Sequence, residues 1–201
     1  MTEDILGVLL AGGPSLRMGR PDKFLLQHQD RTLLQHCLEL ARPQVNQLVI
    51  SANGDPARLA AYELPVIPDF WPDHPGPLAG IISVMVWAQK ARKDYAWLAS
   101  FATDTPHFPK DVVERLRICA ENQNAKVVFA ATERDNHYTF ALWSTQILPD
   151  LLHNFARGER ALHRVAAELG ACREVFLEDE SSFFNVNTLD EWQALNRLQN
   201  E

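Results

Sequence analysis

The chain has 201 residues, a net charge of −7 and 46% hydrophobic residues. This length and composition fit one globular domain with a buried core. The acidic charge argues against nonspecific binding to nucleic acid or to an anionic membrane. The sequence contains no apolar stretch of about 18 residues that would predict a transmembrane helix. An acidic N-terminus also argues against a signal peptide, so we expect a cytoplasmic protein.

The first predicted element is a buried strand over residues 5–10, followed by a loop rich in glycine and positive charge. Gly12 and Gly13 let backbone N–H groups approach a ligand closely, and Ser15 adds a hydroxyl donor. Three cations and one acid follow within residues 14–23: Arg17, Arg20, Lys23 and Asp22. Without the Walker A or Rossmann glycine pattern, such a loop indicates either an ordinary turn or a cradle for the phosphates of a nucleotide.

Predicted helices and strands alternate after this loop. Helices are expected at residues 32–42, 58–62, 78–91 and 109–121, and strands at residues 47–52, 64–67, 95–101 and 126–131. The alternation then loosens. A strand antiparallel to the others is expected at 139–143, helices at 144–155 and 161–169, a strand at 173–177, and a last helix capped by Thr188.

This order predicts an α/β fold, a Rossmann-like three-layer sandwich with a mostly parallel sheet, helices on both faces and an irregular C-terminal part. Ligands of such sheets bind beyond the carboxyl ends of the strands. The glycine loop, Asn53, Asp69 and Asp104 each follow a predicted strand. We therefore expect them to line one edge of the sheet. The scattered histidines and the cysteines Cys37, Cys119 and Cys172 predict free thiols and no structural metal.

Two polar motifs each allow two interpretations. Asp104 follows an apolar strand and could bind Mg²⁺, which takes one or two carboxylates; the sequence Thr103–Pro106 is equally typical of a turn before a helix. Asn185 and Asn187 alternate around Val186, so an extended segment would present both amides on one face. A turn is the alternative for them as well.

Several motifs in one order along nearly the whole chain resemble those of nucleotidyltransferases with a Rossmann-like fold, and most closely the molybdenum cofactor guanylyltransferase (MobA) family. The resemblance rests on residues 10–23 and on three later segments: Pro75-Gly76-Pro77-Leu78-Ala79-Gly80, Thr103-Asp104-Thr105-Pro106 and Phe184-Asn185-Val186-Asn187-Thr188. It implies a Mg²⁺-dependent enzyme that transfers GMP from GTP to molybdopterin with release of pyrophosphate.

The resemblance also implies roles for individual residues. Catalytic roles fall on Arg17, Lys23 and Asp104, and Asp104 would hold the magnesium ion. Contacts with the nucleotide or the molybdenum cofactor would come from Leu10, Ala11, Gly12, Gly13, Ser15, Lys23, Ser51, Asn53, Asp69, Gly80, Asp104, Asn185 and Asn187.

Residues 1–110 would form the nucleotide-binding half of a single domain over residues 1–201, and residues 111–201 the acceptor-side half. Residues 136–139 and Arg160 are further candidates on the acceptor side. His137 is expected to bind or to support structure rather than to act as a base, because an attacking phosphate is already anionic. A molybdenum insertase and target molybdoenzymes are candidate protein partners.

Two departures from the family pattern bear on specificity. Ser51 stands where the family often has asparagine, whereas Gly13 favours guanine over cytosine by resemblance. Thr103 stands where relatives often have cysteine, and no functional effect is expected. Cytidylyl transfer to the same cofactor, nucleotidyl transfer to a sugar phosphate, and a noncatalytic carrier are the alternative functions.

Overall fold

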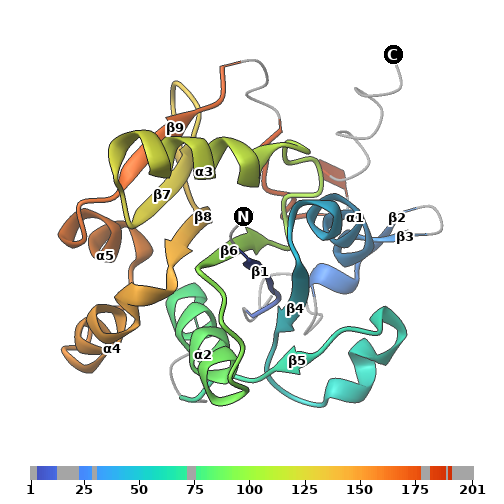
Figure 1. Cartoon of the computed structure of the whole chain (residues 1–201). Coiled ribbons are helices and arrows are strands. Elements are labelled where there is room, and N and C mark those ends of the chain that lie inside the picture. The colour runs from blue at the N-terminus through green and yellow to red at the C-terminus, as the bar shows by residue number, and fades with distance from the viewer. Residues whose placement is uncertain are drawn as a thin grey trace.

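The computed structural model describes residues 4–12, 23–28, 31–71, 76–177, 182–188, 190 and 191. Within these residues a seven-stranded sheet has the order β5-β4-β1-β6-β8-β7-β9 (Figure 1). The strands are β1 (Ile5–Leu10), β4 (Gln47–Ser51), β5 (Val66–Ile67), β6 (Trp97–Ala102), β7 (Val127–Ala131), β8 (Asn136–Ser144) and β9 (Cys172–Val175). Neighbouring strands of this sheet are parallel except where β8 pairs with β6 and with β7. The predicted mostly parallel sheet with one antiparallel strand is confirmed.

Helices cover both faces of this sheet (Figure 1). On one face lie α1 (Leu33–Ala41) and α3 (Val112–Gln123). On the other lie α2 (Pro77–Lys90), α4 (Leu148–Ala156) and α5 (Leu162–Glu168). Strand β1 is apolar on both of its faces. Ile5 and Leu9 pack in the core on the side of α1 and α3, and Leu6 and Val8 pack in the core on the side of α2, α4 and α5. All four are buried, so both faces of the sheet must be covered by helices.

Short elements complete the chain. The strands β2 (Gln27–His28) and β3 (Arg31–Thr32) pair as an antiparallel hairpin. The 3₁₀ turns are η2 (Lys23–Leu25), η3 (Arg42–Gln44), η4 (Pro56–Tyr62) and η5 (Thr145–Ile147). Among the residues with described positions, no helix has both the length and the apolar character needed to cross a membrane.

Capping residues explain where several helices begin. Thr32 caps α1 as predicted, with its hydroxyl accepting from the N–H of Gln35, whose side chain accepts from the N–H of Thr32. The helix predicted to begin at Pro109 instead begins at Val112, because turns occupy residues 106–111. Ser144 caps η5 rather than a continuous helix. The helix predicted after Thr188 lies mostly outside the described residues.

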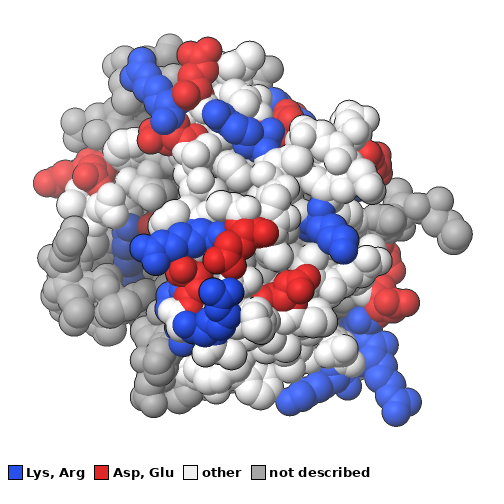
Figure 2. Space-filling view, turned by 90° about the vertical axis from the view of Figure 1, so that its left-hand side faces the viewer, with Lys and Arg blue, Asp and Glu red and all other residues white. Residues whose placement is uncertain are grey.

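Charges of both signs are interspersed on the side of the molecule that carries α4 and α5 in Figure 1. In the view of Figure 2, lysines and arginines lie beside aspartates and glutamates rather than in a patch of one sign. Arg164 and Glu159 form one such pair, with an N–O distance of 3.4 Å. The described residues of this face therefore offer no concentrated positive field of the kind that attracts nucleic acid.

Gly80 brings α2 against the carboxyl ends of β1 and β4. A Cβ atom at this position would lie 2.5 Å from Oγ of Ser51 and 3.2 Å from Cδ2 of Leu10. Ser51 and Gly80 are both buried. The absence of a side chain at Gly80 thus sets the distance between α2 and the ends of β1 and β4.

We predict that Gly80→Ala lowers the free energy of unfolding by about 1–3 kcal/mol, because overpacking outweighs the gain in helix propensity. Urea denaturation measures the effect. Ser51→Ala removes the closest clashing atom, so the double variant Gly80→Ala/Ser51→Ala should recover much of the loss, with Ser51→Ala alone as its reference. An equal loss in both backgrounds would contradict this packing explanation.

Candidate active site

The parallel strands deliver polar groups to one edge of the sheet. Gly12 follows β1, Asn53 follows β4, Asp69 follows β5 and Asp104 follows β6. Since these four strands are parallel, the groups lie at the same edge, as the sequence predicts.

Hydrogen bonds continue past the ends of the strands and fix this edge. The N–H of Ala11 donates to the carbonyl of Ser51 at 2.9 Å, and the hydroxyl of Thr103 donates to the carbonyl of Leu10 at 3.0 Å. A cavity opens above these bonds. Its lining comes from β1, η2, α2, β6 and β8: Leu10, Ala11, Gly12, Lys23, Phe24, Pro77, Ala102, Thr103, Asp104 and Thr139.

Lys23 is the centre of the polar contacts in this cavity. Its Nζ lies 3.0 Å from Oδ2 of Asp104 and 2.9 Å from Oδ1 of Asn187. The side chains of Lys23 and Asp104 are 19% and 33% exposed, so the ion pair is partly shielded from water. Three residues that the sequence singled out therefore meet, although they lie up to 164 positions apart in the chain.

The segment that carries the two asparagines is anchored at two points. Phe183 packs edge-on against Phe140 with ring centres 5.2 Å apart, and Val186 is fully buried in a small apolar cluster beside the β2–β3 hairpin. The side chains of Asn185 and Asn187, on either side of Val186, are exposed. This alternation presents both amides at the surface.

Asn53 and Asp69 form a second polar pair at the same edge. The Nδ2 group of Asn53 donates to Oδ2 of Asp69 at 2.8 Å, and its Oδ1 accepts from the N–H of Asp69 at 2.8 Å. Partial burial raises the pKa of the Asp69 carboxyl, and the hydrogen bond from Asn53 opposes this shift in part. Ser51 does not join this polar pair. Its side chain is buried, and its hydroxyl faces Gly80 on α2.

The other acceptor-side candidates make contacts within the protein. His137 stacks on Phe183 with ring centres 4.5 Å apart, and burial lowers its pKa. The guanidinium of Arg160 lies 3.6 Å from the ring centre of Phe155 and donates to the carbonyl of the same residue at 2.6 Å. Gly13, Ser15 and Arg17 lie outside the described residues.

One residue of this region was not singled out as a site residue by the sequence. Thr105 is fully buried and its hydroxyl lies 2.7 Å from Oδ1 of Asn185. Its position directly after Asp104 was the available signal. Thr139, one of the acceptor-side candidates, lines the cavity, and it lies on β8 near the register shift in the pairing with β7.

Asp104 is the carboxylate best placed to hold a metal at this edge. Among the described residues, no group of three or more His, Cys, Asp or Glu side chains forms a complete metal site. Mg²⁺ needs no such group, since it commonly takes one or two carboxylates and fills its remaining positions with water and substrate phosphate oxygens. The donor set therefore fits magnesium bound together with a nucleotide.

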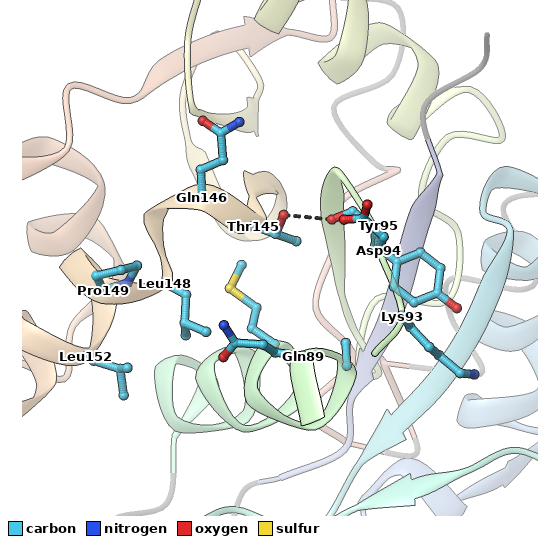
Figure 3. Close-up of a pocket in the computed structure, with 11 residues that line it drawn as sticks. Gln89, Lys93, Asp94, Tyr95, Thr145, Gln146, Leu148, Pro149 and Leu152 are labelled. Atoms are coloured by element: carbon cyan, nitrogen blue, oxygen red, sulfur yellow. Dashed lines mark hydrogen bonds between the residues drawn. The ribbon is translucent and has the colours of Figure 1, made fainter. Parts of the chain in front are cut away.

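A larger hollow, of about 420 Å³, lies at the opposite edge of the sheet (Figure 3). It is bounded by the end of α2, by the segment that leads into β6, and by η5 and α4. Thr145 donates its hydroxyl to the carbonyl of Tyr95 at 2.7 Å, and the Tyr95 hydroxyl donates to Gln47 at 2.6 Å. These polar groups are engaged within the protein, and the phosphate-binding candidates lie at the other edge.

This fold, with the lysine that follows the glycine loop paired with the carboxylate that follows β6, is that of a nucleotidyltransferase. The chain belongs to the MobA-like NTP transferase domain family, whose model matches residues 7–173. The resemblance found in the sequence is thereby confirmed.

Relatives extend the match over nearly the whole chain. The molybdenum cofactor guanylyltransferase of Haemophilus influenzae is 34% identical over 191 residues, which cover 95% of this chain and 97% of the relative. That of Serratia proteamaculans is 35% identical, with all of both chains covered. The fold is similar to that of molybdopterin-guanine dinucleotide biosynthesis protein A from Archaeoglobus fulgidus, with a TM-score of 0.78, 20% identity and 98% of each chain covered.

We predict that Asp69→Asn raises the free energy of unfolding at pH 7. An acid whose folded-state pKa is raised loses stability as pH rises from its ordinary value of 3.8 through the raised value. The advantage of the variant over the wild type should therefore grow across this window and then level off. Urea denaturation at several pH values measures it, with the exposed Asp94→Asn as control. An advantage that does not change with pH would contradict the prediction.

Proposed function

We propose that this protein transfers GMP from GTP to molybdopterin, releases pyrophosphate and forms molybdopterin guanine dinucleotide. The observation that carries the proposal is the contact of Lys23 with Asp104 on one side and Asn187 on the other. This contact joins the nucleotide loop to the segment expected to hold the second substrate. The names of the relatives, molybdenum cofactor guanylyltransferase, support guanine and molybdopterin as the substrates.

The residues present suit an in-line displacement at phosphorus. A phosphate oxygen of molybdopterin forms a bond to the α-phosphorus of GTP, while the bond from that phosphorus to the bridging oxygen breaks and pyrophosphate leaves with the electron pair. The attacking phosphate is already anionic, so no base is needed to remove a proton. Positioning and charge stabilisation supply the rate, without a covalent enzyme intermediate.

Each group at the edge has a task in this scheme. Backbone N–H groups around Gly12 approach the phosphates, and the ammonium of Lys23 balances charge on the transferred phosphoryl group. Asp104 would hold Mg²⁺, which when bound offsets charge on the α-phosphate and on the leaving pyrophosphate. Asn53 and Asp69 hold each other in place beside the nucleoside and contribute to base selection.

In this proposal the two halves of the chain bind different substrates. Residues 1–110 bind the nucleotide, and residues 111–201 contribute most of the residues that bind the acceptor. Arg17 is a second cation for the triphosphate. The cytoplasm as compartment, and an insertase or a molybdoenzyme as protein partner, stay predictions from the sequence.

The direct test measures pyrophosphate release with GTP or CTP, each with and without molybdopterin. We expect release with GTP that depends on molybdopterin and on Mg²⁺, together with formation of the guanine dinucleotide. Preference for CTP would reject the guanine assignment, and transfer to a sugar phosphate would reject the acceptor. Binding of both ligands without turnover would identify a carrier.

We predict that Asp104→Asn lowers kcat by at least about 100-fold, because the amide neither binds Mg²⁺ well nor balances Lys23. The matched control is Glu174→Gln. Glu174 pairs with Arg115 at 3.0 Å, with side chains 27% and 23% exposed, which closely matches the Asp104–Lys23 pair in length and burial. Similar losses of stability but unequal losses of kcat would separate catalysis from folding. Equal kcat values for the two variants would contradict the assignment.

A further inference from the structure

Thr105 connects the nucleotide side of the cavity to the acceptor side. Its side chain is fully buried, and its hydroxyl lies 2.7 Å from Oδ1 of Asn185. The contact to Oδ1 of its neighbour Asp104 is 3.5 Å, at the limit for a hydrogen bond, so the proton points to Asn185.

The main chain at this position is held from two sides, which fixes the backbone that carries the Thr105 side chain. The carbonyl of Asp104 accepts from the N–H of Val186 at 2.7 Å. The carbonyl of Thr105 accepts from the Sγ of Cys37, a fully buried thiol on α1, at 3.6 Å. Burial raises the pKa of this thiol far above its usual range, so it stays protonated and able to donate.

The contacts of the two asparagines determine which group each offers to a ligand. An ammonium can only donate, so the contact with Lys23 requires the oxygen of the Asn187 amide to face that lysine. The Nδ2 of Asn187 lies 3.4 Å from the carbonyl of Asn185. In the hydrogen bonds between described residues, the side chain of Asn185 uses only its oxygen. Within the part of the chain that the structure describes, its two N–H donors therefore have no protein acceptor and can serve a bound molecule.

We propose that Thr105 is a positioning residue: its hydroxyl holds the Asn185 amide so that the N–H groups point toward the phosphate of the acceptor. This inference rests on the proposed function, since it concerns the second substrate of that reaction. Thr105 itself touches no substrate. Donor groups suit an anionic phosphate, whereas an amide oxygen at the same place would repel it.

The expected kinetic signature is confined to the acceptor. Thr105→Val keeps the shape of the side chain and removes the donor, so the Asn185 amide is free to turn its oxygen outward. We expect the KM for molybdopterin to rise about tenfold while the KM for GTP changes less than twofold. Thr105→Ser retains the hydroxyl and should restore a KM near that of the wild type.

A double-mutant cycle separates positioning from general destabilisation. In an Asn185→Ala background, Thr105→Val should have no further effect on the KM for molybdopterin. Thr145→Val is the matched control, because Thr145 also donates a 2.7 Å hydrogen bond to an oxygen, but at the opposite edge of the sheet. It should change stability without changing either KM.

Asn185→Asp provides a test that does not depend on the folding of the Thr105 variants. The aspartate keeps an oxygen for Thr105 and replaces the N–H donors by a second, negative oxygen. We expect it to raise the KM for molybdopterin more than Asn185→Ala does.

Two outcomes would overturn the inference: equal changes in both KM values for Thr105→Val, or a milder effect of Asn185→Asp than of Asn185→Ala. Failure of the wild type to transfer GMP to molybdopterin would instead reject the proposed function, and the wild-type assay reports this separately.

Discussion

The ion pair between Lys23 and Asp104 is the contact on which the arrangement of this edge depends. A carboxylate that is only 33% exposed loses much of its hydration, and the ammonium at 3.0 Å compensates for that loss. The pair also joins the end of the glycine loop to the end of β6, 81 positions later in the chain. Because Lys23 also contacts Asn187, one side chain fixes the spacing of three segments.

The sheet makes this contact possible. Hydrogen bonds between parallel strands align β1 with β4 and with β6 over five and six residue pairs, so their carboxyl ends come to the same level. At Gly80, α2 packs closely against Leu10 and Ser51, the last residues of β1 and β4, and so helps to hold these strand ends in place. Asn53, Asp69 and Asp104 each lie two residues beyond the end of their strand, which limits the conformational entropy lost when these groups are ordered.

Sequence reasoning recovered the parts of this structure that depend on hydrophobic pattern. The strands, the two-sided cover by helices and the antiparallel strand near residue 140 follow from apolar runs and capping residues, and topology alone placed Asn53, Asp69 and Asp104 at one edge. The start of α3 at Val112 could not be found, because turns at residues 106–111 compete with the helix-initiating tendency of Pro109. The orientation of Ser51 and the role of Thr105 depend on contacts between distant segments, and local pattern contains no information about such contacts.

The antiparallel strand determines which residues border the cavity on the side of β8. In a sheet that continued parallel beyond β6, the next strand would also end at the nucleotide edge and add one more loop there. Instead β8 runs the other way and begins at that edge, so Thr139, in the first half of this strand, borders the cavity. Phe140 on the same strand provides the surface on which Phe183 packs. The segment with Asn185 and Asn187 is thus anchored to the strand that reverses the sheet, and from there Asn187 contacts Lys23 and the N–H of Val186 donates to the carbonyl of Asp104.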